Sequence, residues 1–149
     1  MKNKYYLMGI LLCFLILGTA CTKGTKDEPP AAFVKIKDEK IEIAKGSYRW
    51  ETKGLFSNHA VIADASAPFQ LAEDLNVNVV SNSGADVAFS DGSEPQVHAY
   101  VWEGEQRGKE LSWKHDQLSL PSEKGKYVIE LSAEWLNGEA SYTFVIERK

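Results

Sequence analysis

Cysteine and histidine are scarce in this chain of 149 residues. The two cysteines, Cys13 and Cys21, both lie near the beginning, and there are three histidines. A disulfide scaffold needs paired cysteines, and a zinc site needs three or four ligands at short spacing. The sequence therefore predicts no disulfide framework, no metal site and no cofactor, so a folded domain must be stabilised by its hydrophobic core.

Long hydrophobic runs are also lacking. The main apolar stretch, residues 5–17, is short for a membrane span of about 20 residues but suits the centre of a signal peptide. Lys2 and Lys4 precede it, and small residues lead into Cys21. This start resembles a bacterial lipoprotein signal, cleaved before a cysteine that becomes lipidated, although Gly18 stands where that family prefers leucine. The alternative is an ordinary cleaved signal followed by a stray cysteine.

The resemblance implies that Cys21 is the lipid attachment site. A lipoprotein cysteine carries at least two acyl chains, and two chains anchor stably where one binds only reversibly. We therefore expect a location on the outer, extracytoplasmic face of the cell membrane, with the membrane as a partner through the lipid. Removal of residues 1–20 takes away two lysines and changes the net charge from −4 to −6. This charge argues against nucleic acid as a partner.

The composition divides the chain into three parts. Residues 1–20 are the expected signal peptide, which is removed. Residues 21–32 contain the lipidated cysteine and a polar segment with Pro29 and Pro30, which is typical of a flexible spacer. Residues 33–149 form one domain, long enough to bury a sizeable core.

The domain is rich in short alternating segments. They cover residues 33–37, 76–80, 86–90, 96–103, 110–113 and 117–120, and turn residues separate them. A one- to two-turn helix is expected after Pro68, and residues 51–74 otherwise have little strand character. Seven to nine short strands with turns about every ten residues predict an all-β fold, an antiparallel Ig-like β-sandwich with one short helix.

The strongest local pattern lies at the end of the chain, around Asn137 and Gly138. Asn-Gly favours a two-residue type I′ turn, because both central positions need positive φ. That turn would place Leu131 opposite Phe144, and both strands would turn their apolar residues to the same side. Near the beginning of the domain, an apolar pattern changes parity around Gly46, which indicates a β-bulge or tight turn at residues 45–47.

Two sequence blocks carry a resemblance. Residues 46–50 (Gly-Ser-Tyr-Arg-Trp), with Pro68 and Leu71, form the first, and residues 124–127 and 133–144 form the second. Together they resemble a pattern in small uncharacterised lipoproteins of Gram-positive bacteria with an Ig-like domain. The resemblance implies a fold and a location but no activity. Members of that group often carry cysteine where this chain has Arg49, so no thiol role is implied here.

Catalytic motifs are not evident. The sequence has no Gly-x-Ser-x-Gly elbow, no His-Glu-x-x-His and no phosphate-binding glycine loop. His59 and Asp64 could meet as a general base and the carboxylate that orients it, which would make a small hydrolase. Two solvent-facing loop residues are the simpler interpretation.

Aromatic residues give the other candidates. On residues 96–103, one face would carry His98, Tyr100 and Trp102, and the other would carry two valines and an alanine. The aromatic strip could be an exposed docking surface. The favoured alternative places Trp102 in the core, as the buried tryptophan of a sandwich. The same two interpretations, an exposed docking surface or a position in the core, apply to Tyr48 and Trp50.

These observations predict a membrane-anchored binding or protein-interaction module of the cell envelope. Its partner would be another envelope protein or a cell-wall component. The alternatives are the hydrolase that uses His59 and Asp64, or a structural or inhibitory lipoprotein without a small-molecule ligand.

Overall fold

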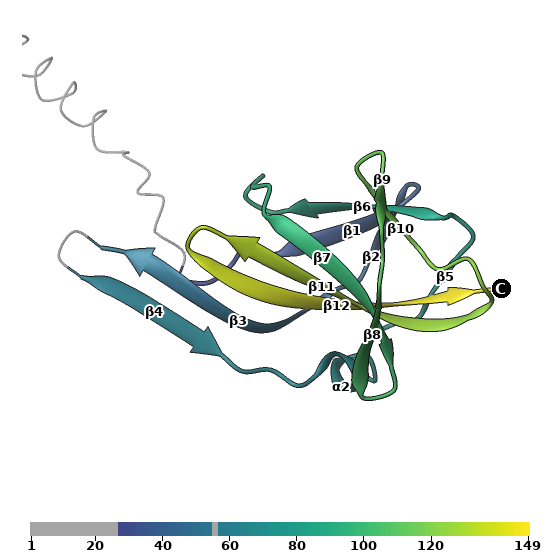
Figure 1. The fold of residues 1–149 in the computed structure, drawn as a ribbon, viewed down its shortest axis with the longest axis horizontal. Helices are drawn as coiled ribbons and strands as arrows, with labels where there is room; N and C mark the ends of the chain where they lie inside the picture. The colour runs from purple at the N-terminus through teal and green to yellow at the C-terminus, as the bar shows by residue number, and fades with distance from the viewer. Residues whose placement is uncertain (1–26, 55–56) are drawn as a thin grey trace, which may run out of the picture.

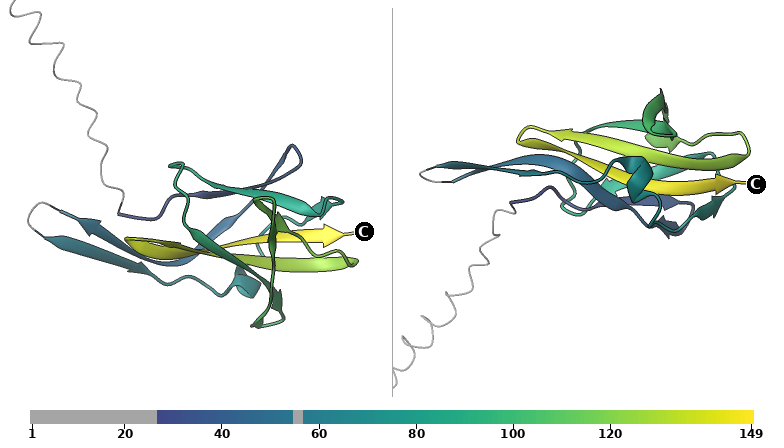
Figure 2. Two further views of the ribbon diagram at one scale, coloured as in Figure 1. Left: turned by 45° about the horizontal axis from the view of Figure 1, so that its top comes forward. Right: turned by 90° about the horizontal axis from the view of Figure 1, so that it is seen from below.

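Two sheets pack face to face in the computed structural model, which describes residues 27–54 and 57–149 (Figures 1 and 2). The five-stranded sheet has the order β2 (Glu39–Ile41), β1 (Ala32–Ile36), β6 (Gly84–Phe89), β10 (Gln117–Ser119) and β9 (Trp113–Lys114). The larger, seven-stranded sheet has the order β4 (Asn58–Ala63), β3 (Ala44–Lys53), β12 (Gly138–Arg148), β11 (Gly125–Trp135), β7 (Gln96–Glu103) and β8 (Gln106–Glu110), with β5 (Asn78–Val80) parallel to β12. The all-β sandwich predicted from the sequence is thus confirmed.

The expected short helix is also present. It is α2 (Pro68–Leu71), a single turn that contacts β3, β11 and β12. Proline at the first helical position has its φ preset for the helix and needs no N–H partner there. Pro68 is buried, so this turn covers part of the outer face of the larger sheet. No helix among the described residues is long and apolar enough to cross a membrane.

The core lies between the sheets and depends on β11 and β12. Ile129, Leu131, Phe144 and Ile146 are fully buried in it. Burying each of these side chains contributes about 1.5–3 kcal/mol, so together they outweigh local backbone preferences. An aromatic group closes one end of the core, where Phe89 and Trp135 meet edge to face with their ring centroids 5.0 Å apart.

The predicted register of the β11–β12 hairpin was wrong by two residues. Trp135 pairs with Gly138, so Leu136 and Asn137 form the turn, and Ile129 rather than Leu131 faces Phe144. A shift of two keeps each side chain on its predicted face. Gly138 does not have positive φ. Instead it allows close approach of β3, because a Cβ at this position would lie 2.7 Å from Cε3 of Trp50.

The bulge expected at residues 45–47 is confirmed. Ala140 pairs with Tyr48 and Tyr142 pairs with Lys45, so β3 has one more residue than β12 in this interval. Beyond the bulge, Tyr48 pairs with Ala140 and faces the core with it. Ile41, which has the opposite parity in the sequence, lies on β2 of the other sheet and reaches the core independently of this bulge.

The low strand character expected for residues 51–74 was wrong for their first part. β3 continues to Lys53, and β4 pairs with it from Asn58 to Ala63. The β3–β4 hairpin extends past the β11–β12 turn (Figure 1). Pairing with β12 holds β3 in place, which local sequence does not reveal.

The folded domain begins before residue 33. Pro29 and Pro30, expected in the flexible spacer, are buried. Lys45 donates a 2.8 Å hydrogen bond from Nζ to the carbonyl oxygen of Pro29 and forms a 3.2 Å ion pair with Glu28. Residues 1–26, which include the expected signal peptide and Cys21, lie outside the described residues.

Candidate functional site

The aromatic strip of β7 lies on the outer face of the larger sheet. Ala99 is fully buried opposite Leu131, so the side with the small residues points into the core. His98, Tyr100 and Trp102 point outward and are half-buried. The favoured interpretation, with Trp102 in the core, was therefore wrong. Pairing with β11 places Ala99 beside the buried Leu131 and so turns Trp102 to the outer face. There α2 shelters Trp102, with Phe69 at 6.2 Å between ring centroids.

A buried carboxylate organises this face. Glu130 on β11 is opposite Tyr100, and its side chain is only 4% exposed. It accepts a 2.7 Å hydrogen bond from Nε1 of Trp102 and two from Arg107, at 3.0 Å from Nε and 2.8 Å from Nη2. Charge-assisted bonds in this two-pronged geometry are among the strongest in proteins. Glu130 therefore fixes the positions of both side chains.

Arg107 connects the carboxylate with the aromatic strip. Its guanidinium carbon lies 4.5 Å from the ring centroid of Tyr100, a cation–π contact. The hydrogen bonds to Glu130 raise the pKa of Arg107 above its ordinary value. About half of the Arg107 side chain stays exposed, so part of a fixed cationic plane faces the solvent.

His98 continues the strip toward the beginning of β7. Its Nδ1 lies 2.7 Å from Oε1 of Glu110 on β8, and its ring stacks toward Tyr100 with centroids 6.4 Å apart. A second contact joins Nε2 of His98 to the amide of Gln96 at 3.1 Å. Both ring nitrogens thus have partners on the protein, which favours a role in orientation over a role as a free base.

A polar hollow of about 380 Å³ lies beside this network on the same face. Arg107 and Glu130 line it, together with Arg49 of β3 and Asp64, which directly follows β4. Serine side chains at positions 47, 132 and 141 contribute hydroxyl groups. We call the combined area of this hollow and the aromatic strip the outer-face surface. Its hydrogen-bonding groups and aromatic planes suit a polar ligand or an extended polypeptide.

The structure does not bring His59 and Asp64 together. β4 is extended between them, and five residues of strand cover about 16 Å. His59 instead contacts the hydroxyl of Ser57 at 3.2 Å on an exposed part of the hairpin. The alternative of a catalytic pair therefore has no support, and both side chains are exposed, as the simpler interpretation expects, although His59 lies on a strand. Of the two, only Asp64 joins the outer-face surface.

Tyr48 and Trp50 point inward from β3. Trp50 is 8% exposed and packs edge to face on Trp135, with centroids 5.3 Å apart. Tyr48 is half-buried and packs against the core. Both side chains therefore support the fold, and Tyr48 also lines the polar hollow. Only Trp50 is left out of the outer-face surface.

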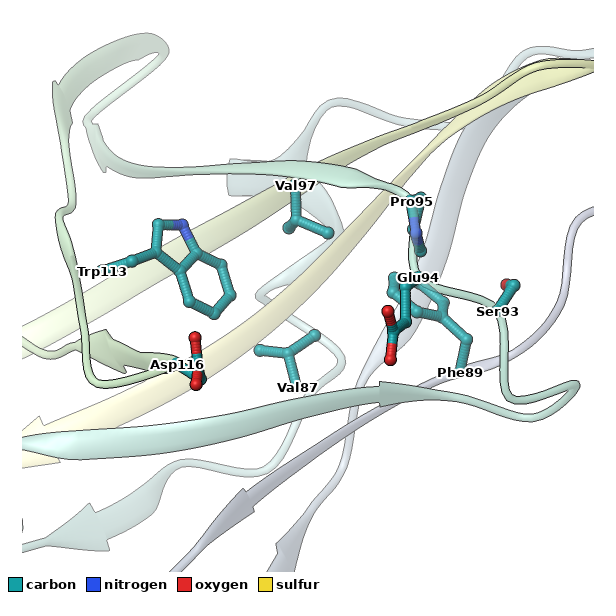
Figure 3. A pocket seen from close by; sticks show the side chains of 8 residues that line it. All are labelled: Val87, Phe89, Ser93, Glu94, Pro95, Val97, Trp113 and Asp116. Carbon is teal, nitrogen blue, oxygen red and sulfur yellow. The ribbon is translucent and has the colours of Figure 1, made fainter.

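A second hollow, also of about 380 Å³, opens on another side of the sandwich (Figure 3). Val87 of β6 and Val97 of β7 point into it from opposite sides, and Trp113 of β9 closes one end (Figure 3). Glu94 and Asp116 place carboxylates around it. β10 pairs with β6 only at Gly84 and Ala85, which leaves the rest of β6 open toward this second hollow.

The sequence interpretation did not find Glu130 or Arg107. Glu130 lies on an alternating strand where an outward polar residue is ordinary, and Arg107 lies in a segment that was expected to be a turn. Their partnership depends on the β7–β8 and β7–β11 pairings, which leave no local signal. The sequence likewise carries no signal for the residues of the second hollow, because β6, β7 and β9 come together only in the fold.

Among the described residues, no group of three histidine, cysteine, aspartate or glutamate side chains is placed to hold a metal ion. No family model, curated protein or solved structure matches this chain. The geometry of the chain's own residues is therefore the basis for inferring its function.

Proposed function

We propose that this chain is a lipoprotein of the cell envelope, tethered to the outer face of the membrane through Cys21. In this proposal it acts as a binding or protein-interaction module. Support for the tether comes from the lipoprotein-like sequence before Cys21. The partner is a cell-wall component or another envelope protein, and the outer-face surface recognises it.

One observation supports this choice of surface most strongly. Glu130 is buried and bonded by Trp102 and Arg107, and Arg107 in turn stacks on Tyr100. The network holds an aromatic plane and a guanidinium in fixed positions while both remain partly exposed. Aromatic and arginine side chains that are ordered before binding lose little conformational entropy on binding.

The hydrolase that would use His59 and Asp64 has no support from this geometry. A structural or inhibitory lipoprotein remains the second candidate. It would use the same surface, because exposed aromatic side chains and arginine also suit a protein partner.

The membrane tether is tested by Cys21→Ser in the full chain. We expect the unchanged chain in the membrane fraction, with acyl chains on Cys21 detected by mass spectrometry. The Cys21→Ser variant should be released into the soluble extracytoplasmic fraction. Equal membrane association of both forms would contradict the tether.

Recognition is tested separately with Tyr100→Ala and His98→Ala. The probes are isolated cell-wall sacculi and a panel of purified envelope proteins. For a probe that the unchanged chain binds, each variant should bind with about 10-fold lower affinity, since a hot-spot aromatic side chain contributes about 1.4 kcal/mol or more. Phe33→Ala is the matched control, because Phe33 is a half-buried aromatic residue that faces out from the other sheet under Lys40. The proposed surface would be contradicted if all three variants lost binding affinity equally. It would also be contradicted if none of them lost binding affinity.

A further inference from the structure

The edge strand β4 differs from the other strands that end the two sheets. Natural sheets protect their edges with short strands, charged side chains or proline. β2 has Glu39 and Lys40, and β9 has only two residues, of which one is Lys114. β8 carries Arg107, Lys109 and Glu110 among its five residues. β5, which pairs only with β12, has no charged residue but is only three residues long. These four edges are therefore protected against pairing with another strand by charge or by short length.

β4 has none of these protections. Its six residues, Asn-His-Ala-Val-Ile-Ala, contain no lysine, arginine, aspartate, glutamate or proline. Ile62 is 66% exposed. Among the described residues, β3 is the only strand that pairs with β4. A six-residue apolar edge of this kind is a ready template for another strand.

The hydrogen bonds of the β3–β4 hairpin show which backbone groups are free. Gly54 donates to the carbonyl oxygen of Ser57 at 2.9 Å, which defines a hydrogen-bonded pair. Such pairs alternate along an antiparallel ladder. His59 and Val61 therefore direct their N–H and C=O groups toward β3, and Asn58, Ala60 and Ile62 direct theirs outward.

From this geometry we infer that β4 pairs with β4 of a second copy of this chain. The two strands are antiparallel around a two-fold axis at Ala60, so Asn58 of one copy faces Ile62 of the other. In this register all three outward residues form hydrogen-bonded pairs with the second copy. The two larger sheets become one continuous sheet.

A second copy meets no like charge on the β4 edge. The chain carries a net charge of −4, which opposes the close approach of two copies at their charged surfaces. Self-pairing of β2 or β8 would bring several charged side chains of one copy close to those of the other, whereas β4 has no charged residue to oppose. The β3–β4 hairpin also extends past the β11–β12 turn, so this edge is accessible (Figure 1).

Pairing also affects the outer-face surface. Ile62 lines the polar hollow together with Asp64 and Arg49. The dimer therefore places two copies of that hollow on one continuous face, on either side of the two-fold axis. This inference concerns self-association and does not depend on what the outer-face surface binds.

Cysteine cross-linking in cells that produce the full chain tests the register. Hydrogen-bonded antiparallel pairs have Cα atoms about 5.5 Å apart, which lies within the range that a disulfide spans. Ala60→Cys lies on the two-fold axis, so it should give a cross-linked dimer on a non-reducing gel after mild oxidation.

Ile62→Cys is the matched control, since it has the same edge position and a high exposure. Its two copies would lie about 14 Å apart in this register and should not cross-link. Co-expression of Ile62→Cys with Asn58→Cys should restore the cross-link. Failure of Ala60→Cys to cross-link, or equal cross-linking by Ile62→Cys alone, would overturn the inference.

Discussion

The hydroxyl of Tyr142 donates a 2.6 Å hydrogen bond to the carbonyl oxygen of Pro30, 112 residues earlier in the chain. Tyr142 is 1% exposed, and its bond fixes the segment that precedes β1 against the last strand. The start of the domain is therefore attached to the central hairpin of the larger sheet. Any spacer that leads to a lipid on Cys21 must end at this attachment.

This bond predicts a pH-dependent difference between the unchanged chain and Tyr142→Phe. At pH 7 the variant should be less stable by about 1–2 kcal/mol, because the buried carbonyl of Pro30 loses its donor. Burial, assisted by the charges of Asp91 and Glu28, raises the pKa of Tyr142 above its ordinary value. The folded state therefore keeps its proton to higher pH than the unfolded state.

The stability that this protonated hydroxyl contributes is complete below pH 10 and is lost as the pH rises beyond it, where tyrosine in the unfolded chain ionises. The advantage of the unchanged chain over Tyr142→Phe should shrink by about 1 kcal/mol between pH 10 and pH 11. Urea unfolding of both proteins at several pH values measures this difference. A constant difference would show that Tyr142 does not resist ionisation.

Glu130→Ala should reduce the free energy of unfolding by about 1–3 kcal/mol, because it removes the acceptor for Trp102 and Arg107. The loss should stay below the 3–5 kcal/mol of a fully buried pair, since half of the Arg107 side chain reaches water. Glu51→Ala is the control, because Glu51 pairs with Arg49 at 3.3 Å while both are largely exposed. It should change stability by less than about 0.5 kcal/mol. Similar values for both variants in chemical denaturation would refute the organising role of Glu130.

Gly138→Ala tests the reason for glycine after the turn. A Cβ there would collide with the carbonyl oxygen of Arg49 and with Trp50, so we expect a loss of about 2 kcal/mol or more. Gly138→Asn should be at least as harmful. If Gly138 instead occupied a type I′ turn with positive φ, asparagine would be tolerated there. Thermal unfolding of both variants distinguishes these explanations.

Leu131→Ala and Leu136→Ala make the same substitution at a buried position on β11 and at an exposed position in the turn that follows it. Leu131 is fully buried, and its truncation should cost about 2–5 kcal/mol. Leu136 lies on the tip of the turn and is fully exposed, so its truncation should cost less than about 0.5 kcal/mol. A large loss from Leu136→Ala in equilibrium unfolding would show that the turn is covered in solution, for example by a partner.

Period-two alternation in the sequence was enough to predict a β-sandwich and the inner faces of β11 and β12. Alternation reports which side chains avoid water, and a register shift of two residues leaves that property unchanged. The change of parity around Gly46 predicted the bulge in β3, but part of that change has another cause, because the chain passes from one sheet to the other between Ile41 and β3. The helix after Pro68 followed from the backbone geometry of proline itself.

Only the tertiary structure decided the rest. Asn137 and Gly138 have a strong local preference for one turn, but contact with β3 made Gly138 a close-approach position instead. Both faces of β7 are apolar in sequence, so the strand could have been turned either way. The register with β11 placed Ala99 opposite the buried Leu131 and so turned the face with Ala99 to the core. That choice left Tyr100 outside, beside an arginine and a glutamate from two other strands, because strand pairing joins residues that local sequence cannot relate.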